Sequence, residues 1–212
     1  VEINKQETKI LLQPGINKIS QIIRLNEISL WSPNNPSLYK LKSYIKIKDK
    51  TEDIVFENFG FREFTVKDDR FYLNDKPIYL KAAFFEGLYP IKLAHPDSKE
   101  MVIKEIMMAK KAGFNMIRPW RKPPPPMWLK IADSLGVLTV GSMAIECMDM
   151  PIETPYLPRR VENEITESIL RDRNHVSIVQ WELFNEIRRP VLANMLKPMA
   201  LKARKLDPTR MI

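Results

Sequence analysis

The sequence predicts a multi-domain fold in which a partial β-sandwich is followed by a parallel sheet flanked by helices. Two observations predict it. In residues 1–66, short apolar runs are separated by Pro, Gly and Asn, which is typical of antiparallel strands joined by turns. In residues 77–212, strand-like and helix-like runs alternate, which is typical of a parallel sheet. Residues 67–76 are expected to link the two domains.

The first domain is expected to be built from four strands. No apolar repeat with the helical period is visible in this part of the chain. An immunoglobulin-like sandwich uses about seven strands over roughly 100 residues, so this domain is expected to be truncated at its N-terminal side. The expected strands are 8-TKILLQ-13, 16-INKISQIIRL-25, 38-LYKLKSYIKIK-48 and 53-DIVFENFGF-61.

The second domain is expected to contain four β–α units, about half of a (β/α)8 barrel, which takes roughly 250 residues. Ser98 and Gly113 suit the two ends of the first helix, and Pro198 is expected to kink the last one. Residues 207–212 are expected to begin a further strand. A doubly wound sheet fits the same alternation, although no glycine-rich phosphate loop follows any strand. The expected strands are 78–85, 114–120, 137–145 and 177–184, and the expected helices are 98–113, 126–136, 159–173 and 191–206.

Polar and aromatic residues gather where these four strands are expected to end. In a barrel, the chemistry lies on the loops that follow the strands. Burying an amide or a carboxylate without partners costs about 1–3 kcal/mol, so Asn185 and Glu186 at the end of an apolar strand predict a function there. The full set is Glu86, Tyr89, Arg118, Trp120, Arg121, Glu146, Asp149, Asn185, Glu186 and Arg188.

Composition argues against several classes of site and partner. Cys147 is the only cysteine and there are two histidines, so no internal disulfide and no cysteine-based or histidine-rich metal site are expected. No apolar run approaches the roughly 20 residues of a membrane span. The formal net charge of +8 would suit nucleic acid, but no RNA-binding signature or zinc finger accompanies it. We therefore expect a solvated basic surface and no nucleic-acid partner.

Four stretches resemble motifs of glycoside hydrolase family 2, which includes β-galactosidases, β-glucuronidases and β-mannosidases. The segment 172-DRNHVSIVQWELFNE-186 resembles the acid/base signature of that family. The resemblance implies the end of an immunoglobulin-like domain followed by the first half of a (β/α)8 TIM barrel, the catalytic domain. The other stretches, which occur in the order of the family, are 30-LWSPNNPSLYKL-41, 59-FGFREF-64 and 72-YLNDKPIYLK-81.

The same resemblance implies a retaining β-glycoside hydrolase that acts on a carbohydrate substrate and needs no cofactor. Glu186 is then the general acid/base, which protonates the leaving oxygen and later deprotonates water. Asn185 is the residue that hydrogen-bonds the 2-hydroxyl of the sugar. The nucleophile of the family is a second glutamate on strand seven, beyond the end of this chain, so the fragment alone is expected to be inactive. The alternative is a non-catalytic carbohydrate-binding or assembly module derived from such an enzyme.

Three further residues are expected to contact the substrate: Arg118, Trp120 and Glu146. The stiff proline run after Trp120 is expected to hold it at the wall of the site. Trp181 is expected to lie in the core. His175 precedes its strand, at the end of a barrel that serves stability, and is expected to be structural.

Glu182 departs from the family pattern, which has a small residue there. Alternation along the strand turns Glu182 to the same side as Glu186, into the barrel, where a carboxylate requires a partner. Arg118 or Arg121 is the expected partner. Open sheet edges predict that the isolated chain self-associates or is poorly stable. The basic residues near the expected mouth, which fit an acidic sugar or a charged surface equally, are Arg118, Arg121, Lys122, Arg188 and Arg189.

Overall fold

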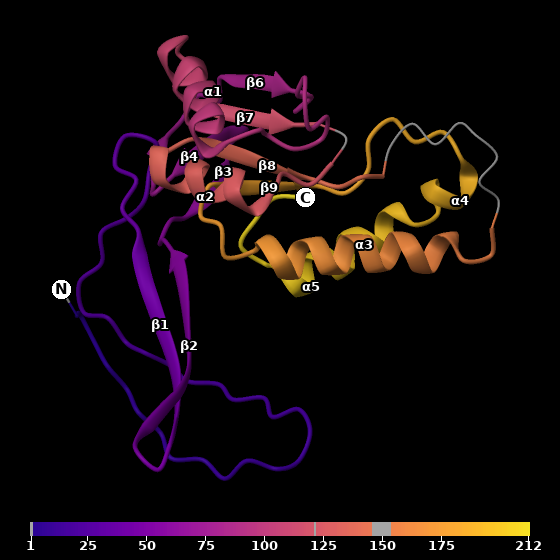
Figure 1. Cartoon of the computed structure of the whole chain (residues 1–212). Coiled ribbons are helices and arrows are strands. Elements are labelled where there is room, and N and C mark those ends of the chain that lie inside the picture. Colours follow the sequence, from indigo (N-terminus) through magenta and orange to yellow (C-terminus); the bar gives the residue numbers. More distant parts are fainter. Residues whose placement is uncertain (1, 121, 146–153) are drawn as a thin grey trace.

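Figure 1 shows the computed structural model of the chain, which describes residues 2–120, 122–145 and 154–212. Within these residues, the strands form a two-stranded, a three-stranded and a four-stranded sheet. The two-stranded sheet extends away from the layered part of the molecule, with the N-terminal segment beside it (Figure 1). The four-stranded sheet and its helices form the layered part, which carries the candidate site.

The two-stranded sheet is an antiparallel hairpin. Strand β1 (Tyr39–Ile47) pairs with β2 (Lys50–Phe59), as predicted. The turn residues Lys48 and Asp49 both have positive φ, 49° and 65°, as a two-residue turn of type I′ requires. The two earlier strands, expected over residues 8–13 and 16–25, are absent: the described backbone is irregular there. A strand needs a neighbour to bond its ladder, and an alternating sequence without one forms no strand.

A three-stranded antiparallel sheet joins the two domains. It consists of β3 (Phe64–Lys67), β4 (Arg70–Leu73) and β5 (Lys76–Pro77), so residues expected to form a linker are paired in strands. Phe64 and Leu73 are buried together with Trp31 against the residues that begin the parallel strands. This small sheet therefore closes the N-terminal end of the parallel sheet, opposite the candidate site.

The parallel sheet contains four strands in the order of the sequence. Parallel pairing joins β6 (Ala82–Phe85), β7 (Met116–Pro119), β8 (Leu138–Ser142) and β9 (Ile178–Glu182). Helices α1 (Lys99–Lys111), α2 (Pro126–Leu135) and α3 (Leu157–Asp172) make the three crossovers. Right-handed crossovers that always advance in one direction place all helices on one face, whereas a doubly wound sheet reverses its order. The order is therefore consistent with part of a (β/α)8 barrel.

The C-terminal part of the chain, residues 190–212, tests two of the sequence predictions. Met211 pairs in parallel with Gln180, which confirms that residues 207–212 begin a further strand. The last predicted helix is divided into α4 (Pro190–Ala193) and α5 (Leu196–Leu206), so a kink at Pro198 was the wrong prediction. Pro198 lies in the first turn of α5, where a backbone N–H has no acceptor within the helix and its loss costs nothing.

Trp181 anchors the core between the sheet and the helices. Its side chain is 1% exposed, as predicted, and its Nε1 donates to Asp207 Oδ2 at 2.9 Å. The ring packs so closely on β8 that a Cβ added to Gly141 would lie 2.3 Å from it. The strands that carry the candidate site are therefore held rigidly against each other.

Candidate active site

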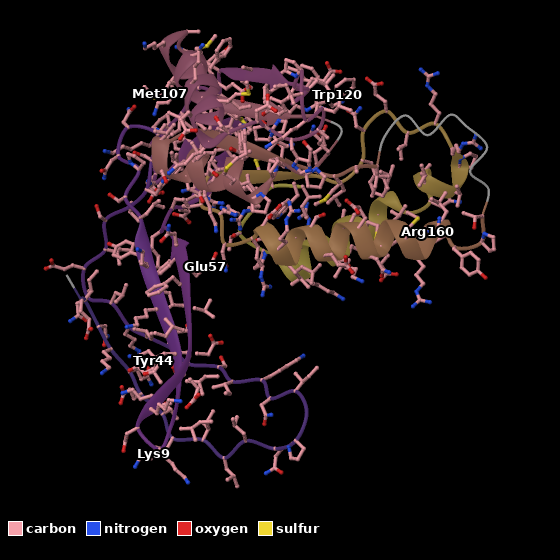
Figure 2. All side chains as sticks on the ribbon, viewed as in Figure 1. Lys9, Tyr44, Glu57, Met107, Trp120 and Arg160 are labelled. Atoms are coloured by element: carbon pink, nitrogen blue, oxygen red, sulfur yellow. The ribbon has the colours of Figure 1, made fainter. Side chains whose placement is uncertain are left out.

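The predicted site residues on strands lie at the end of the parallel sheet where the strands finish. Figure 2 labels Trp120 at this end, to which β6 and β7 run. The strand register places Phe84 beside Arg118 and Ser142 beside Glu182. These side chains come from four neighbouring strands near the end of the sheet, and Arg118 on β7 reaches Glu182 on β9 through its side chain.

A hydrogen-bonded cluster, composed of Arg118, Glu182 and Asn185, lies at this end of the sheet. Arg118 Nε donates to Glu182 Oε2 at 3.1 Å, and its Nη2 donates to Glu182 Oε1. The same Nη2 donates to Asn185 Oδ1 at 2.9 Å. The sequence predicted that Glu182 requires a basic partner, and Arg118 is confirmed in that role; Arg121, the other candidate, lies outside the described residues.

Ser142 anchors the cluster from β8, and sequence reasoning missed it. Its side chain is 3% exposed, and its Oγ lies 3.0 Å from Glu182 Oε2 and in hydrogen-bond contact with the Pro119 carbonyl. The signal in the sequence was a lone hydroxyl near the end of the apolar run 137-VLTVGSMAI-145. Only the register with β9 shows that this hydroxyl meets a carboxylate.

Two aromatic rings border the cluster. The Phe84 and Trp120 ring centroids lie 4.9 Å apart at 57°, and the Arg118 guanidinium carbon lies 5.9 Å from the Phe84 ring centroid. Phe84 is 55% exposed, so one of its faces is open to solvent. Exposed aromatic surface beside charged groups can stack on the apolar face of a sugar ring.

Lys122 ties together the loops that follow β6 and β7. Its Nζ donates to the carbonyls of Gly87 at 2.6 Å and Ala94 at 2.9 Å, and burial lowers its pKa. A small hollow beside it is lined by Trp120, Trp128 and the proline run. Hydrogen bonds from Lys122 therefore hold the two loops on this side of the site together.

Asn185 and Glu186 lie in the segment that follows β9. The Asn185 backbone N–H donates to the Ile145 carbonyl at 3.0 Å, which fixes this position to the segment that follows β8. Glu186 is exposed and has φ 48°, a left-handed conformation that is uncommon for a residue other than glycine. Backbone strain of this kind often accompanies a functional position.

Other residues of the predicted set lie elsewhere. Tyr89 is buried and donates from its hydroxyl to Glu105 Oε2 on α1 at 3.2 Å, and burial raises the pKa of Tyr89. Glu86 and Arg188 are exposed. The predictions for Glu146 as a substrate contact, for Asp149 as a strand-end polar residue and for Cys147 as the lone cysteine fall outside the described residues.

The opposite end of the sheet is structural. His175 is buried, and its Nδ1 lies 2.6 Å from Asp133 Oδ2. Arg62 donates to the carbonyls of Val176, Ile178 and Thr209, while burial, together with the neighbouring Arg210, lowers the pKa of Arg62 to about 9. In the described ranges, no three His, Cys, Asp or Glu side chains form a group that could hold a metal ion, and no helix is long and apolar enough to span a membrane.

Comparison with known protein families matches both parts of the chain to one family. The family description "Glycosyl hydrolases family 2, TIM barrel domain" matches residues 64–212, from β3 to the end of the chain. The chain belongs to glycosyl hydrolase family 2. A second description, "Glycosyl hydrolases family 2", matches residues 1–62 of this family 2 chain.

Relatives of the family 2 chain are glycosidases by name. A protein of Formosa agariphila, provisionally named a beta-glucuronidase, is 33% identical over 189 residues, which are 86% of this chain and 18% of that protein. A beta-galactosidase of Photobacterium profundum is 27% identical over 174 residues, 79% of this chain and 17% of that protein. A solved family 2 member from Bacteroides cellulosilyticus has a TM-score of 0.77 at 25% identity, covering 86% of this chain and 24% of that one. The chain thus spans less than a fifth of the curated relatives that it matches.

Proposed function

We propose that this chain is part of a retaining β-glycoside hydrolase that hydrolyses O-glycosyl bonds in a carbohydrate. Glu186 is the general acid/base, and Asn185, Arg118, Trp120 and Glu146 contribute to substrate binding. The observation that carries the proposal is the hydrogen bond from Arg118 to the Asn185 amide, directly before Glu186, at the carboxyl end of a parallel sheet. Family membership supports the same chemistry.

In the proposed mechanism, Glu186 acts twice. As an acid it protonates the glycosidic oxygen while a carboxylate nucleophile attacks the anomeric carbon, and as a base it then deprotonates the water that releases the sugar. Retaining chemistry places the two carboxyl groups about 5–5.5 Å apart. Glu182 is not our candidate for the nucleophile, because both of its oxygens accept from Arg118. By the resemblance to the family, the nucleophile is the glutamate of strand seven in the complete barrel.

The domain division forms part of the proposal. Residues 1–66 correspond to an immunoglobulin-like β-sandwich domain, residues 67–76 lead into the barrel, and residues 77–212 belong to the catalytic (β/α)8 domain. The Trp31 side chain and the Arg62 guanidinium, which both contact the second domain, support one compact joint between the two.

The sugar is proposed only as a β-linked carbohydrate. Two of the basic residues that fitted an acidic sugar have other roles in the structure. The charge of Arg118 is matched by Glu182, and Lys122 donates to two backbone carbonyls. The relatives carry names of both beta-galactosidase and beta-glucuronidase, so a substrate panel must contain neutral and acidic sugars.

The test is the substitution Glu186→Ala in the full-length protein, assayed on aryl β-galactosides and β-glucuronides. Loss of the acid should slow substrates with poor leaving groups by about 10²–10⁴-fold and leave activated aryl substrates less affected. Azide should restore turnover and form a β-glycosyl azide, because it attacks the glycosyl-enzyme without a base. Glu167→Ala, on the exposed side of α3, is the matched control. If the wild-type protein binds the sugar without hydrolysing it, and the Glu186→Ala variant binds it equally well, the carbohydrate-binding module is favoured instead.

A further inference from the structure

Three hydrogens of the Arg118 guanidinium, one on Nε and two on Nη2, have acceptors within the cluster. The Nε hydrogen and one Nη2 hydrogen are directed to the two oxygens of Glu182, and the second Nη2 hydrogen is directed to Asn185 Oδ1. A bidentate arginine–carboxylate pair fixes the plane of the guanidinium. Once that plane is fixed, the direction of the second Nη2 hydrogen is fixed too.

This hydrogen determines how the Asn185 side chain is presented. A guanidinium can only donate, so the amide must turn its oxygen toward Arg118 and its NH₂ group the other way. A sugar hydroxyl that meets the NH₂ group is then bound through its oxygen as an acceptor. If Arg118 were released, the amide could present either its NH₂ group or its oxygen, and against the oxygen the hydroxyl would have to act as the donor instead of the acceptor.

The fixed end of this chain of contacts is Glu182. Its side chain is 18% exposed, against 34% for Arg118, and the buried Ser142 hydroxyl lies 3.0 Å from its Oε2. Ser142 and Glu182 are register partners on β8 and β9. The carboxylate is therefore held by the sheet, and it holds Arg118.

We propose that Glu182 is a positioning residue that sets the orientation of the Asn185 amide through Arg118. It does not touch the substrate, and by the resemblance to the family it replaces a small residue. The inference rests on the proposed function, because it requires Asn185 to bind a substrate hydroxyl. A purely structural ion pair is the competing explanation, and the two differ in which substrates they affect.

The experiment compares two aryl β-glycosides, one with and one without the 2-hydroxyl, on the full-length wild-type protein and on Glu182→Gln. The neutral amide cannot accept both Arg118 hydrogens. On the complete sugar, kcat should fall by about 10- to 100-fold with KM within about threefold, because the contact strengthens in the transition state. On the 2-deoxy sugar, which has no hydroxyl for Asn185, wild type and variant should agree within about threefold.

Moving the carboxylate from position 182 to position 142 should restore the activity that Glu182→Gln loses. The double variant Ser142→Glu/Glu182→Ser moves the acid to the register partner, within reach of the same guanidinium, and should restore the wild-type ratio between the two substrates. Ser142→Ala/Glu182→Ser, which has no carboxylate at either position, should not. Thermal melting of each variant verifies folding, and Glu167→Gln is the control for removal of a charge. If Glu182→Gln does not fold, the two double variants carry the same comparison.

The outcomes separate the two proposals. Equal losses on both sugars, or no loss on either, overturn the positioning role while leaving the proposed function intact, provided that the Glu186 variant is impaired. If the wild-type protein hydrolyses neither sugar, or if the Glu186 variant turns over normally, the proposed function is wrong and the positioning role is wrong with it.

Discussion

The two parts of this family 2 chain use their apolar side chains in opposite ways. Of the buried apolar residues in the described ranges, Trp31 is the one that precedes Phe64; the others follow it. In the first part, Leu11 is 87% and Ile16 94% exposed, and both faces of the β1–β2 hairpin are largely open. The second part has a core in which Ile106, Leu129, Ile165 and Ile178 are all at 0% exposure.

This difference shows that a strand buries its apolar side chains only where another layer of secondary structure packs against it. The parallel sheet obtains its partners from within the chain, because each crossover helix covers the strands that it connects. Strand-like sequence in the first part has apolar faces and no second layer among the described residues to cover them. The contact between the two parts is therefore expected to stabilise the first. Trp31 packs at the N-terminal end of the parallel sheet, and its Nε1 donates to the Asp133 carbonyl at 2.8 Å.

Trp31→Ala should have the largest effect on this contrast. It removes a fully buried indole and one buried hydrogen bond, which costs about 3–5 kcal/mol of unfolding free energy. Urea denaturation of the chain, followed by circular dichroism, measures it. Trp31→Phe keeps most of the volume and should lose less. A Trp31→Ala change below about 1 kcal/mol would mean that the joint does not couple the two parts.

Substituting one glycine in each part by alanine should show the same difference in packing as a difference in the free energy of unfolding. At Gly141 the added Cβ would lie 2.3 Å from the Trp181 ring, so Gly141→Ala should cost about 1–3 kcal/mol through overpacking. At Gly15 no atom lies within 4 Å of the added Cβ, and its φ of +101° can relax in an irregular segment. Gly15→Ala should therefore cost less than about 1 kcal/mol. Denaturation midpoints compare the two, and equal costs would contradict the assignment of the rigid core to the second part.

The second part could be predicted well because its signals are local. Apolar runs alternate with helical periods there, and the caps at Ser98 and Gly113 were confirmed: Ser98 accepts from Met101, and Gly113 has φ 88°. The pairing of Arg118 with Glu182 was also predictable, because strand parity turned the carboxylate inward and burial demanded a cation. The cluster could thus be anticipated in part from alternation and electrostatics alone.

Other features depended on information that is not local. The role of Ser142 follows from the register of two strands 40 residues apart. Tyr89 was grouped with the site because it follows a strand, yet it binds Glu105 on the next helix. The strands expected at residues 8–13 and 16–25 have the right alternation and no ladder partner. The period of apolar residues indicates which face of a strand or helix a side chain occupies, but it does not indicate which other element packs against that face.

The smallest effect on stability is expected from Leu11→Ser with Ile16→Ser. Both side chains are almost fully exposed, so the unfolding free energy should change by less than about 0.5 kcal/mol for each substitution. Association should change instead, because exposed apolar side chains promote contacts between copies. Sedimentation velocity over a range of concentrations should show that the wild-type chain self-associates and that the double variant does so less. Equal association of both chains would place the contact at another surface, such as the edge of the parallel sheet at β6. A monomeric wild-type chain would contradict the self-association that the sequence predicts.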